Sequence, residues 1–246
     1  MHGHAAHVVV YHAVAIHAVI ICHPHVVREI AFRGITRFLR AALALLFPRK
    51  KISVVTPTWK RQALLAGRCI PAVRAQSYRG PVEHVIVSDG PDPDLDMPGV
   101  CFLPEHKLAP NRGIWARLHG TEISTGEYVG YLDDDNAWKP YHLELLADAL
   151  EDSGADFAYS RARCIDPGGY KWTIGCDPPQ FAQIDTSLIL HRRGLLDVAQ
   201  WKPSSFPADW DLVLRWVQAG ASWVHVPVVT LDYYVQAPAT AICSGT

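Results

Sequence analysis

Three consecutive aspartates, Asp133, Asp134 and Asp135, follow a short apolar run in the segment YVGYLDDDNAWKP, residues 128–140. Adjacent carboxylates make one another harder to ionise, so the cluster is best tolerated where solvent, a basic partner or a metal ion offsets the charge. A solvated turn or helix start is one interpretation. The other is a site for a hard divalent cation, Mg²⁺ or Mn²⁺, because these ions prefer oxygen ligands.

Two other strand-like segments end in polar residues. KISVVTPTW, residues 51–59, carries Thr56 and Thr58 at its end, and VEHVIVSDG, residues 82–90, carries Asp89. In open α/β sheets ligands bind beyond the carboxyl ends of the strands, so these tips and the aspartates should converge on one crevice. The chain has no GxGxxG or GxxxxGK[ST] loop, so a diphosphate bound there would need a divalent cation.

The segments around these tips alternate between strand and helix patterns. Strands are predicted over 51–59, 82–90, 127–135 and 155–163, a short one over 101–105, and helices over 60–77, 113–124, 142–154 and 210–220. This alternation predicts an α/β domain with a mostly parallel central sheet flanked by helices.

Bulk composition bounds the class of protein. The chain has 246 residues, a formal charge of −1 and 49% hydrophobic residues, which indicates a globular domain with an appendage and no nucleic-acid partner. Its six cysteines form no CxxC pair, as expected for reduced thiols in a cytoplasmic protein. The basic run after Pro48 places the predicted boundary between 1–50 and 51–246.

The predicted extension, residues 1–50, has two parts. Its first part is rich in histidine and apolar residues, but the histidine spacing fits neither a zinc finger nor a HExxH helix. The apolar stretch 5–22 is shorter than the roughly 20 residues of a membrane span. Residues 28–47 have the pattern of a basic amphipathic helix. Such a helix either contacts an anionic membrane surface peripherally or packs on the main domain.

Five motifs occur in order between residues 51 and 236: ISVVTPTWKR, IVSDGPD, NRGIWARLHG, GEYVGYLDDDNAWKP and ADWDLVLRW. Together they resemble glycosyltransferase family 2, the nucleotide-sugar-dependent transferases of the GT-A fold. The resemblance implies a Rossmann-like GT-A catalytic domain over 51–246 with an N-terminal helical extension. It also implies a cytoplasmic enzyme, free or at the cytoplasmic face of the membrane, that acts in polysaccharide or cell-envelope synthesis.

The resemblance also implies a role for each matching residue. A nucleotide-sugar donor would contact Thr56, Thr58, Arg61, Asp89, Asn111, Arg117, Asp133 and Asp134. Asp135 would bind the divalent cation, Mg²⁺ or Mn²⁺. Asp209 would act as the general base in an inverting transfer to a hydroxyl of a glycan, lipid-linked or small-molecule acceptor. The alternative role for Asp209 is that of a helix N-cap.

Ala208 departs from the family pattern, because a glutamate usually precedes the base. This departure keeps a second hypothesis open, a catalytically silent binding or scaffold module. A nucleotidyltransferase is a third, although TPTWKRQ is not the glycine-rich, lysine-containing loop expected of one. Among tryptophans 172, 201, 210 and 223, which mostly suit a core, Trp172 in GGYKWTIG is the best candidate for stacking on a sugar.

Overall fold

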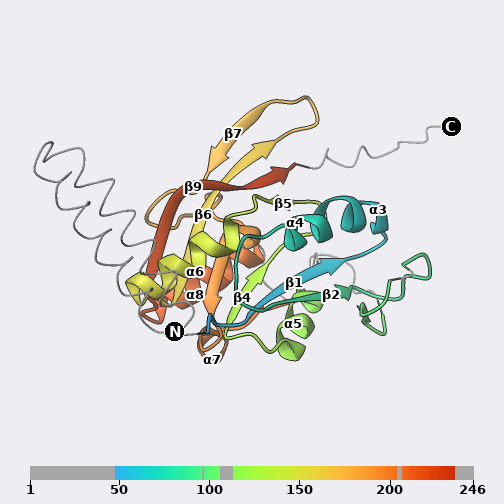
Figure 1. Cartoon of the computed structure of the whole chain (residues 1–246), viewed down its shortest axis with the longest axis horizontal. Coiled ribbons are helices and arrows are strands. Elements are labelled where there is room, and N and C mark those ends of the chain that lie inside the picture. Colours follow the sequence, from blue (N-terminus) through green and yellow to red (C-terminus); the bar gives the residue numbers. More distant parts are fainter. Residues whose placement is uncertain (1–47, 96, 106–112, 204–206, 236–246) are drawn as a thin grey trace, which may run out of the picture. The chain divides into compact units, whose positions relative to one another are not determined.

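The computed structural model describes residues 48–95, 97–105, 113–203 and 207–235 (Figure 1). The chain divides into two compact units, Met1–Arg49 and Lys50–Thr246, and every element below belongs to the second. Asn111 and the predicted helix over 28–47 lie outside the described residues. Within the described residues, no helix has the length and apolar character needed to cross a membrane.

A single mixed sheet forms the centre of the second unit. Its strands are β1 (Ile52–Thr58), β2 (Val82–Ser88), β3 (Cys101–Phe102), β4 (Tyr128–Tyr131), β5 (Ala137–Trp138), β6 (Phe157–Ile165), β7 (Lys171–Ile174), β8 (Ile189–Arg192) and β9 (Trp223–Tyr234). They lie in the order β3-β2-β1-β4-β8-β6-β9-β5, and β7 pairs with β6.

Most of the long strands point the same way. Strands β3, β2, β1 and β4 are parallel neighbours, and β6 and β9 form another parallel pair. Strand β8 lies between the two groups and is antiparallel to both β4 and β6. As a result, the start of β8 lies at the same edge of the sheet as the carboxyl ends of β1, β2 and β4.

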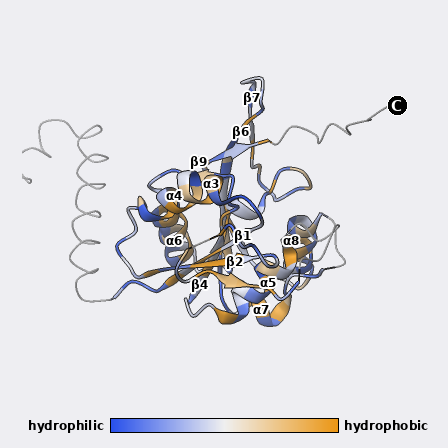
Figure 2. Cartoon of the chain, turned by 90° about the vertical axis from the view of Figure 1, so that its right-hand side faces the viewer, coloured by the Kyte–Doolittle hydropathy of each residue, from blue (hydrophilic) through white to orange (hydrophobic). Residues whose placement is uncertain are grey.

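Helices cover both faces of the sheet. They are α3 (Gln62–Leu64), η1 (Leu65–Cys69), α4 (Ile70–Arg74), α5 (Ile114–Ile123), α6 (His142–Ser153), η2 (Thr186–Leu188), α7 (Leu195–Val198) and α8 (Ala208–Gln218). Figure 2 shows α3, α4 and α6 on one side and α5, α7 and α8 on the other. The predicted mostly parallel sheet between helices is therefore confirmed.

Particular residues explain these elements. All seven residues of β1 are buried, as expected for a β-branched central strand. Helix α5 packs very closely on β1, since a Cβ added at Gly120 would lie 2.6 Å from Val55 Cγ1. Helix α6 ends at Gly154, whose φ of 72° closes it in the left-handed conformation. The helix predicted over 60–77 spans 62–74 and contains the π-helical turn η1.

Candidate active site

The polar tips of three parallel strands meet at one edge of the sheet. At the end of β1, the Thr58 hydroxyl donates to Asp134 Oδ2 at 2.7 Å. At the end of β2, the Asp89 backbone N–H donates to the Thr58 carbonyl at 2.8 Å, and Asp89 is buried. Thr56 lies deeper, with its hydroxyl 2.9 Å from His84 Nε2. Thr58, Asp89 and the aspartate cluster are thus brought together, while Thr56 is fully buried and its hydroxyl contacts His84 and Cys69 instead.

Two arginines form ion pairs with different members of the aspartate cluster. Arg61 Nη1 donates to Asp134 Oδ1 at 2.9 Å and to Asp135 Oδ2 at 2.6 Å. Arg117, from α5, forms an ion pair with Asp133. Arg68, from η1, donates to the Asp135 backbone carbonyl. The three adjacent carboxylates are therefore tolerated through arginine pairing rather than through solvation, because Asp134 and Asp135 are buried.

Arg117 lies at the centre of a second group of acids. Its guanidinium is buried and sits 5.5 Å from the centre of the Trp201 ring. The charges of Asp133, Asp185 and Asp209 all raise the pKa of Arg117, against the lowering effect of burial. Asp209 and Asp133, which are far apart in sequence, thus lie within electrostatic reach of one buried cation.

Burial sets the acidity of these carboxyl groups. It raises the pKa of Asp134 to about 6, although Arg61 and the Thr58 hydroxyl act in the opposite direction. Burial also raises the pKa of Asp135 and of Asp209, and in both cases the charge of Asp133 adds to the shift. A base with a raised pKa is better matched to proton transfer near neutral pH than an ordinary aspartate.

Asp209 lies in the first turn of α8, and Pro207 occupies the N-cap position. The Asp209 Oδ1 atom accepts from the backbone N–H of its neighbour Trp210 at 2.8 Å. The N-cap alternative for Asp209 is therefore wrong. Its carboxylate is held at the start of the helix and takes part in the acidic group around Arg117.

Asp185 is a member of this group that the sequence did not single out. Its side chain accepts from the Ser187 backbone N–H at 2.8 Å and caps η2. Burial, followed by the charges of Asp133 and Asp209, raises the pKa of Asp185 well above the usual range of a carboxyl group. The pattern Asp-Thr-Ser is a local cap signal. The antiparallel direction of β8, which brings Asp185 to this edge, has no such local signal.

The aspartates suit a metal ion only in part. Among the described residues, no group of three or more His, Cys, Asp or Glu side chains is arranged to hold a metal. Magnesium and manganese ions are commonly bound by one or two carboxylates together with substrate phosphates. The oxygen atoms of Asp134 and Asp135 match that chemistry, so a divalent ion shared with a diphosphate is compatible with the site.

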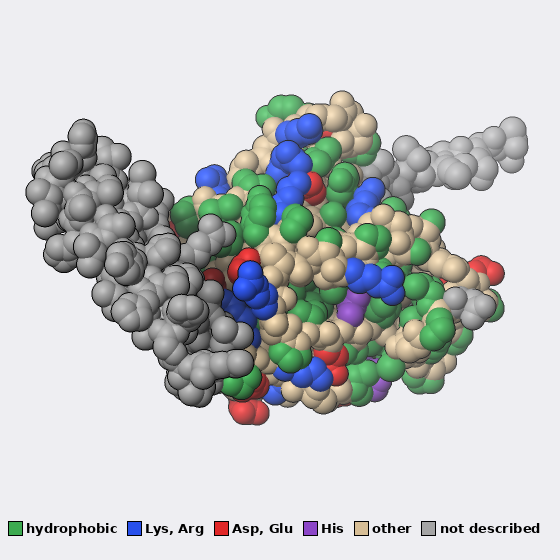
Figure 3. Space-filling model, viewed as in Figure 1, with side chains coloured by type: hydrophobic (Ala, Val, Ile, Leu, Met, Phe, Trp, Pro, Cys, Tyr) green, Lys and Arg blue, Asp and Glu red, His purple; other side chains and the backbone are tan. Residues whose placement is uncertain are grey.

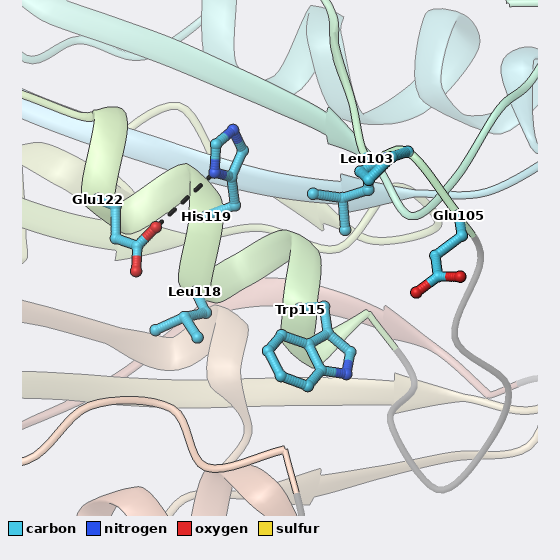
Figure 4. A pocket seen from close by; sticks show the side chains of 7 residues that line it. Leu103, Glu105, Trp115, Leu118, His119 and Glu122 are labelled. Atoms are coloured by element: carbon cyan, nitrogen blue, oxygen red, sulfur yellow. Dashed lines mark ion pairs between the residues drawn. The ribbon is translucent and has the colours of Figure 1, made fainter.

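A separate pocket of about 200 Å³ lies between α5 and the segment that follows β3 (Figure 4). It is lined by Leu103, Pro104, Glu105, Trp115, Leu118, His119 and Glu122. His119 Nδ1 lies 3.7 Å from Glu122 Oε2 at its rim. None of the predicted site residues lines this pocket, so it is not the crevice that the strand tips suggested.

The arrangement of sheet and helices is that of the GT-A fold. Two crystal structures of S. aureus TarS 1-349 are similar to it. The complex with UDP has a TM-score of 0.61 and 15% identity, covering 76% of this chain and 61% of that one. The complex with UDP-GlcNAc has a TM-score of 0.59 and 16% identity, covering 76% and 59%.

The family follows from the sequence comparison. Residues 53–195 match the model of glycosyl transferase family 2, and the chain belongs to that family of glycosyltransferases, as its motifs predicted. A glucosyl-dolichyl phosphate glucuronosyltransferase of Haloferax volcanii is 30% identical over 149 residues, 54% of this chain and 47% of that protein. An uncharacterized glycosyltransferase of Nostoc sp. is 32% identical over 42% of this chain and 34% of its own.

The chain thus spans about half or less of the length of these curated relatives. The family match ends at residue 195, before Asp209 and helix α8. The strand tips, the aspartate cluster, Arg117 and Asp185 all lie inside it.

Proposed function

We propose that this protein transfers a sugar from a nucleoside diphosphate donor to an acceptor hydroxyl, with inversion and with Asp209 as the general base. The observation that carries the proposal is the buried Arg117, which pairs with Asp133 and interacts electrostatically with Asp209. This shared interaction supports the proposal that the aspartate cluster at the donor and the carboxylate at the acceptor form one site.

In this proposal the donor lies over the ends of β1, β2 and β4. Thr58, Asp89 and Asp133 would orient the nucleoside, and Arg61 would turn toward the phosphates. Asp135, aided by Asp134, would hold a Mg²⁺ or Mn²⁺ ion. When bound, such an ion neutralises charge on the departing diphosphate. Two solved structures similar to this chain contain UDP or UDP-GlcNAc, so UDP-sugars are the first donors to test.

Asp209 would accept the proton of the attacking hydroxyl. Its raised pKa favours that role, because burial makes its carboxylate a stronger base than a solvated aspartate. The name of the Haloferax volcanii relative includes a dolichyl phosphate sugar, which favours a lipid-linked acceptor here over a small metabolite. Cytoplasmic localisation and membrane contact through residues 28–47 stay predictions.

A donor screen with a matched pair of variants tests this proposal. Release of nucleoside diphosphate is measured from UDP-, GDP- and dTDP-sugars with Mn²⁺ or Mg²⁺, over a panel of lipid-phosphate and glycan acceptors. Asp209→Asn should reduce transfer by roughly 10²- to 10⁴-fold, the usual contribution of a general base, and leave donor affinity unchanged by calorimetry. Asp211→Asn is the control, because Asp211 pairs with Arg215 at 2.7 Å on the same helix.

Three outcomes decide the matter. Loss of transfer in Asp209→Asn alone supports the assignment of the base. Equal losses in both variants would show that α8 is disturbed as a whole, which contradicts a specific role for Asp209. Donor binding without transfer to any acceptor would favour the silent module, for which Ala208 is the sequence evidence.

A further inference from the structure

The hairpin formed by β6 and β7 extends beyond the rest of the sheet (Figures 1 and 2). It carries two exposed aromatic residues, Tyr170 and Trp172. The exposed fractions of Tyr170 and Trp172 are 68% and 37%. Their ring centroids are 5.8 Å apart, with an interplanar angle of 27°. The two rings thus present a preformed aromatic surface to solvent, and Tyr and Trp are enriched at interaction sites.

Strand register connects this surface to the candidate active site. Cys164 on β6 is paired with Trp172 on β7 and with Tyr233 on β9. Side chains at directly paired positions project from the same face of a sheet. Adjacent strands are about 4.8 Å apart, so Trp172 lies about 10 Å from Tyr233 across the sheet. Trp172, Cys164 and Tyr233 therefore form a row on one face.

The row begins beside the acidic group. The pKa of Tyr233 is raised, with the charge of Asp185 as the largest cause and contributions from Asp133 and Asp209. Burial, with a smaller effect of Asp185, also raises the pKa of Cys164 to about 11. The end of β9 also lies beside the aspartate cluster, because the Tyr234 backbone N–H donates to Asn136 Oδ1 at 3.0 Å.

The opposite face of the hairpin is basic. Arg163 alternates with Cys164 along β6, and Arg163 Nε donates to Asp232 Oδ1 at 2.8 Å. Lys171 is paired with Ile165 and so shares the face of Arg163, not that of Trp172. Figure 3 shows Lys and Arg side chains gathered on the hairpin surface toward the viewer. A membrane-bound hairpin would be expected to join its aromatic rings with basic side chains that meet lipid phosphates, whereas here the two lie on opposite faces.

We propose that Trp172 and Tyr170 form a stacking platform for a sugar ring of the acceptor. This inference rests on the proposed function. One face of a pyranose ring presents C–H groups, which pack well on an aromatic ring. About 10 Å separates Tyr233, near the acidic group, from Trp172, which is more than the width of one sugar ring. The sugar that stacks on Trp172 is therefore a later unit of the acceptor and not the unit that reacts. The acceptor is therefore an oligosaccharide or a glycan chain, and a monosaccharide would not reach the platform.

Saturation-transfer NMR of the full chain tests the platform directly. The probes are maltotriose, cellotriose and chitotriose, with glucose and N-acetylglucosamine as single-ring comparisons. Trp172→Ala should weaken binding of at least one trisaccharide about tenfold, the scale of one aromatic stacking contact, and Trp172→Tyr should retain most of it. Trp223→Ala is the matched control, since Trp223 is 36% exposed at the start of β9, where it pairs with Phe157, about 23 Å along β6 from Cys164, the partner of Tyr233.

Calorimetry with UDP and Mn²⁺ on the same samples separates this inference from the proposed function. Two results would overturn the platform and leave the donor site intact. In the first, UDP binds normally but no trisaccharide binds; in the second, UDP binds normally and Trp172→Ala binds a trisaccharide as well as the wild type does. Binding to phosphatidylglycerol vesicles that depends on Trp172, without any effect on sugars, would also overturn it and identify a lipid contact. The platform is supported if Trp172→Ala loses affinity for a trisaccharide but not for UDP, while Trp223→Ala loses neither.

Discussion

Replacing Arg117 by methionine removes a buried positive charge that pairs with Asp133 and interacts with Asp185 and Asp209. The methionine side chain keeps most of the apolar volume beneath Trp201, so the change acts mainly on charge. Removing one partner of a buried ion pair typically costs about 3–5 kcal/mol, because the other charge is left uncompensated. We expect a loss of that size in the free energy of unfolding at pH 8.

The loss should depend on pH in a defined direction. The charge of Arg117 lowers the pKa of Asp185 and of Asp209, so its removal raises both further. A raised folded-state pKa favours folding below the unfolded value, near 4, and this contribution is lost as the pH rises through the folded value. The destabilisation by Arg117→Met should therefore be smaller at pH 5 than at pH 8.

Urea unfolding at both pH values provides the measurement. Arg215→Met is the control, because the Arg215 pair with Asp211 is partly exposed and such pairs are worth about 1 kcal/mol or less. Adding Asp133→Asn to Arg117→Met should recover at least about 1 kcal/mol, since it removes one of the uncompensated charges. An equal loss at pH 5 and pH 8, with no recovery in the double variant, would show that packing against Trp201 explains the effect and would refute the charge argument.

Two further predictions concern stability. Asp185→Asn should raise the free energy of unfolding by at least about 1 kcal/mol at pH 8 and by little near pH 4, because the amide resembles the protonated acid that burial favours. Urea unfolding at the two pH values is the measurement, and a lower free energy of unfolding for Asp185→Asn than for the wild type at pH 8 would contradict the prediction. Gly120→Ala should destabilise the protein by about 1–3 kcal/mol, because the new methyl group would lie 2.6 Å from Val55 Cγ1. A thermal melt unchanged from wild type would mean that α5 shifts away from β1 at little cost.

The sequence predicted the parallel part of the sheet well, because β1, β2 and β4 are apolar runs that end in polar tips. It also predicted the meeting of Thr58 with the aspartate cluster, since parallel strands end at the same edge. Asp185 was missed for a physical reason. Its position depends on the reversal of β8 between β4 and β6, which is a property of long-range pairing and not of local residue pattern.

The charge balance of the cluster was also only partly predictable. The sequence indicated that the three aspartates need a cation or a donor, but not that Arg61 and Arg117 approach them from different elements. Arginine spacing along the chain carries no information about that convergence. The sequence predicted a continuous helix over 60–77, although this helix contains the π-helical turn η1, with Gly67 inside that turn and Pro71 shortly after it.

Strand β9 has a consequence for how the chain is made. It pairs with β6 on one side and with β5 on the other, and its Thr230 hydroxyl is 2.6 Å from His142 Nδ1 at the start of α6. Until residues 223–234 have left the ribosome, the edges of both earlier strands stay open to pairing with other chains. Contacts between residues so far apart form slowly, so the nascent protein passes through a stage that exposes it to aggregation and makes chaperones useful.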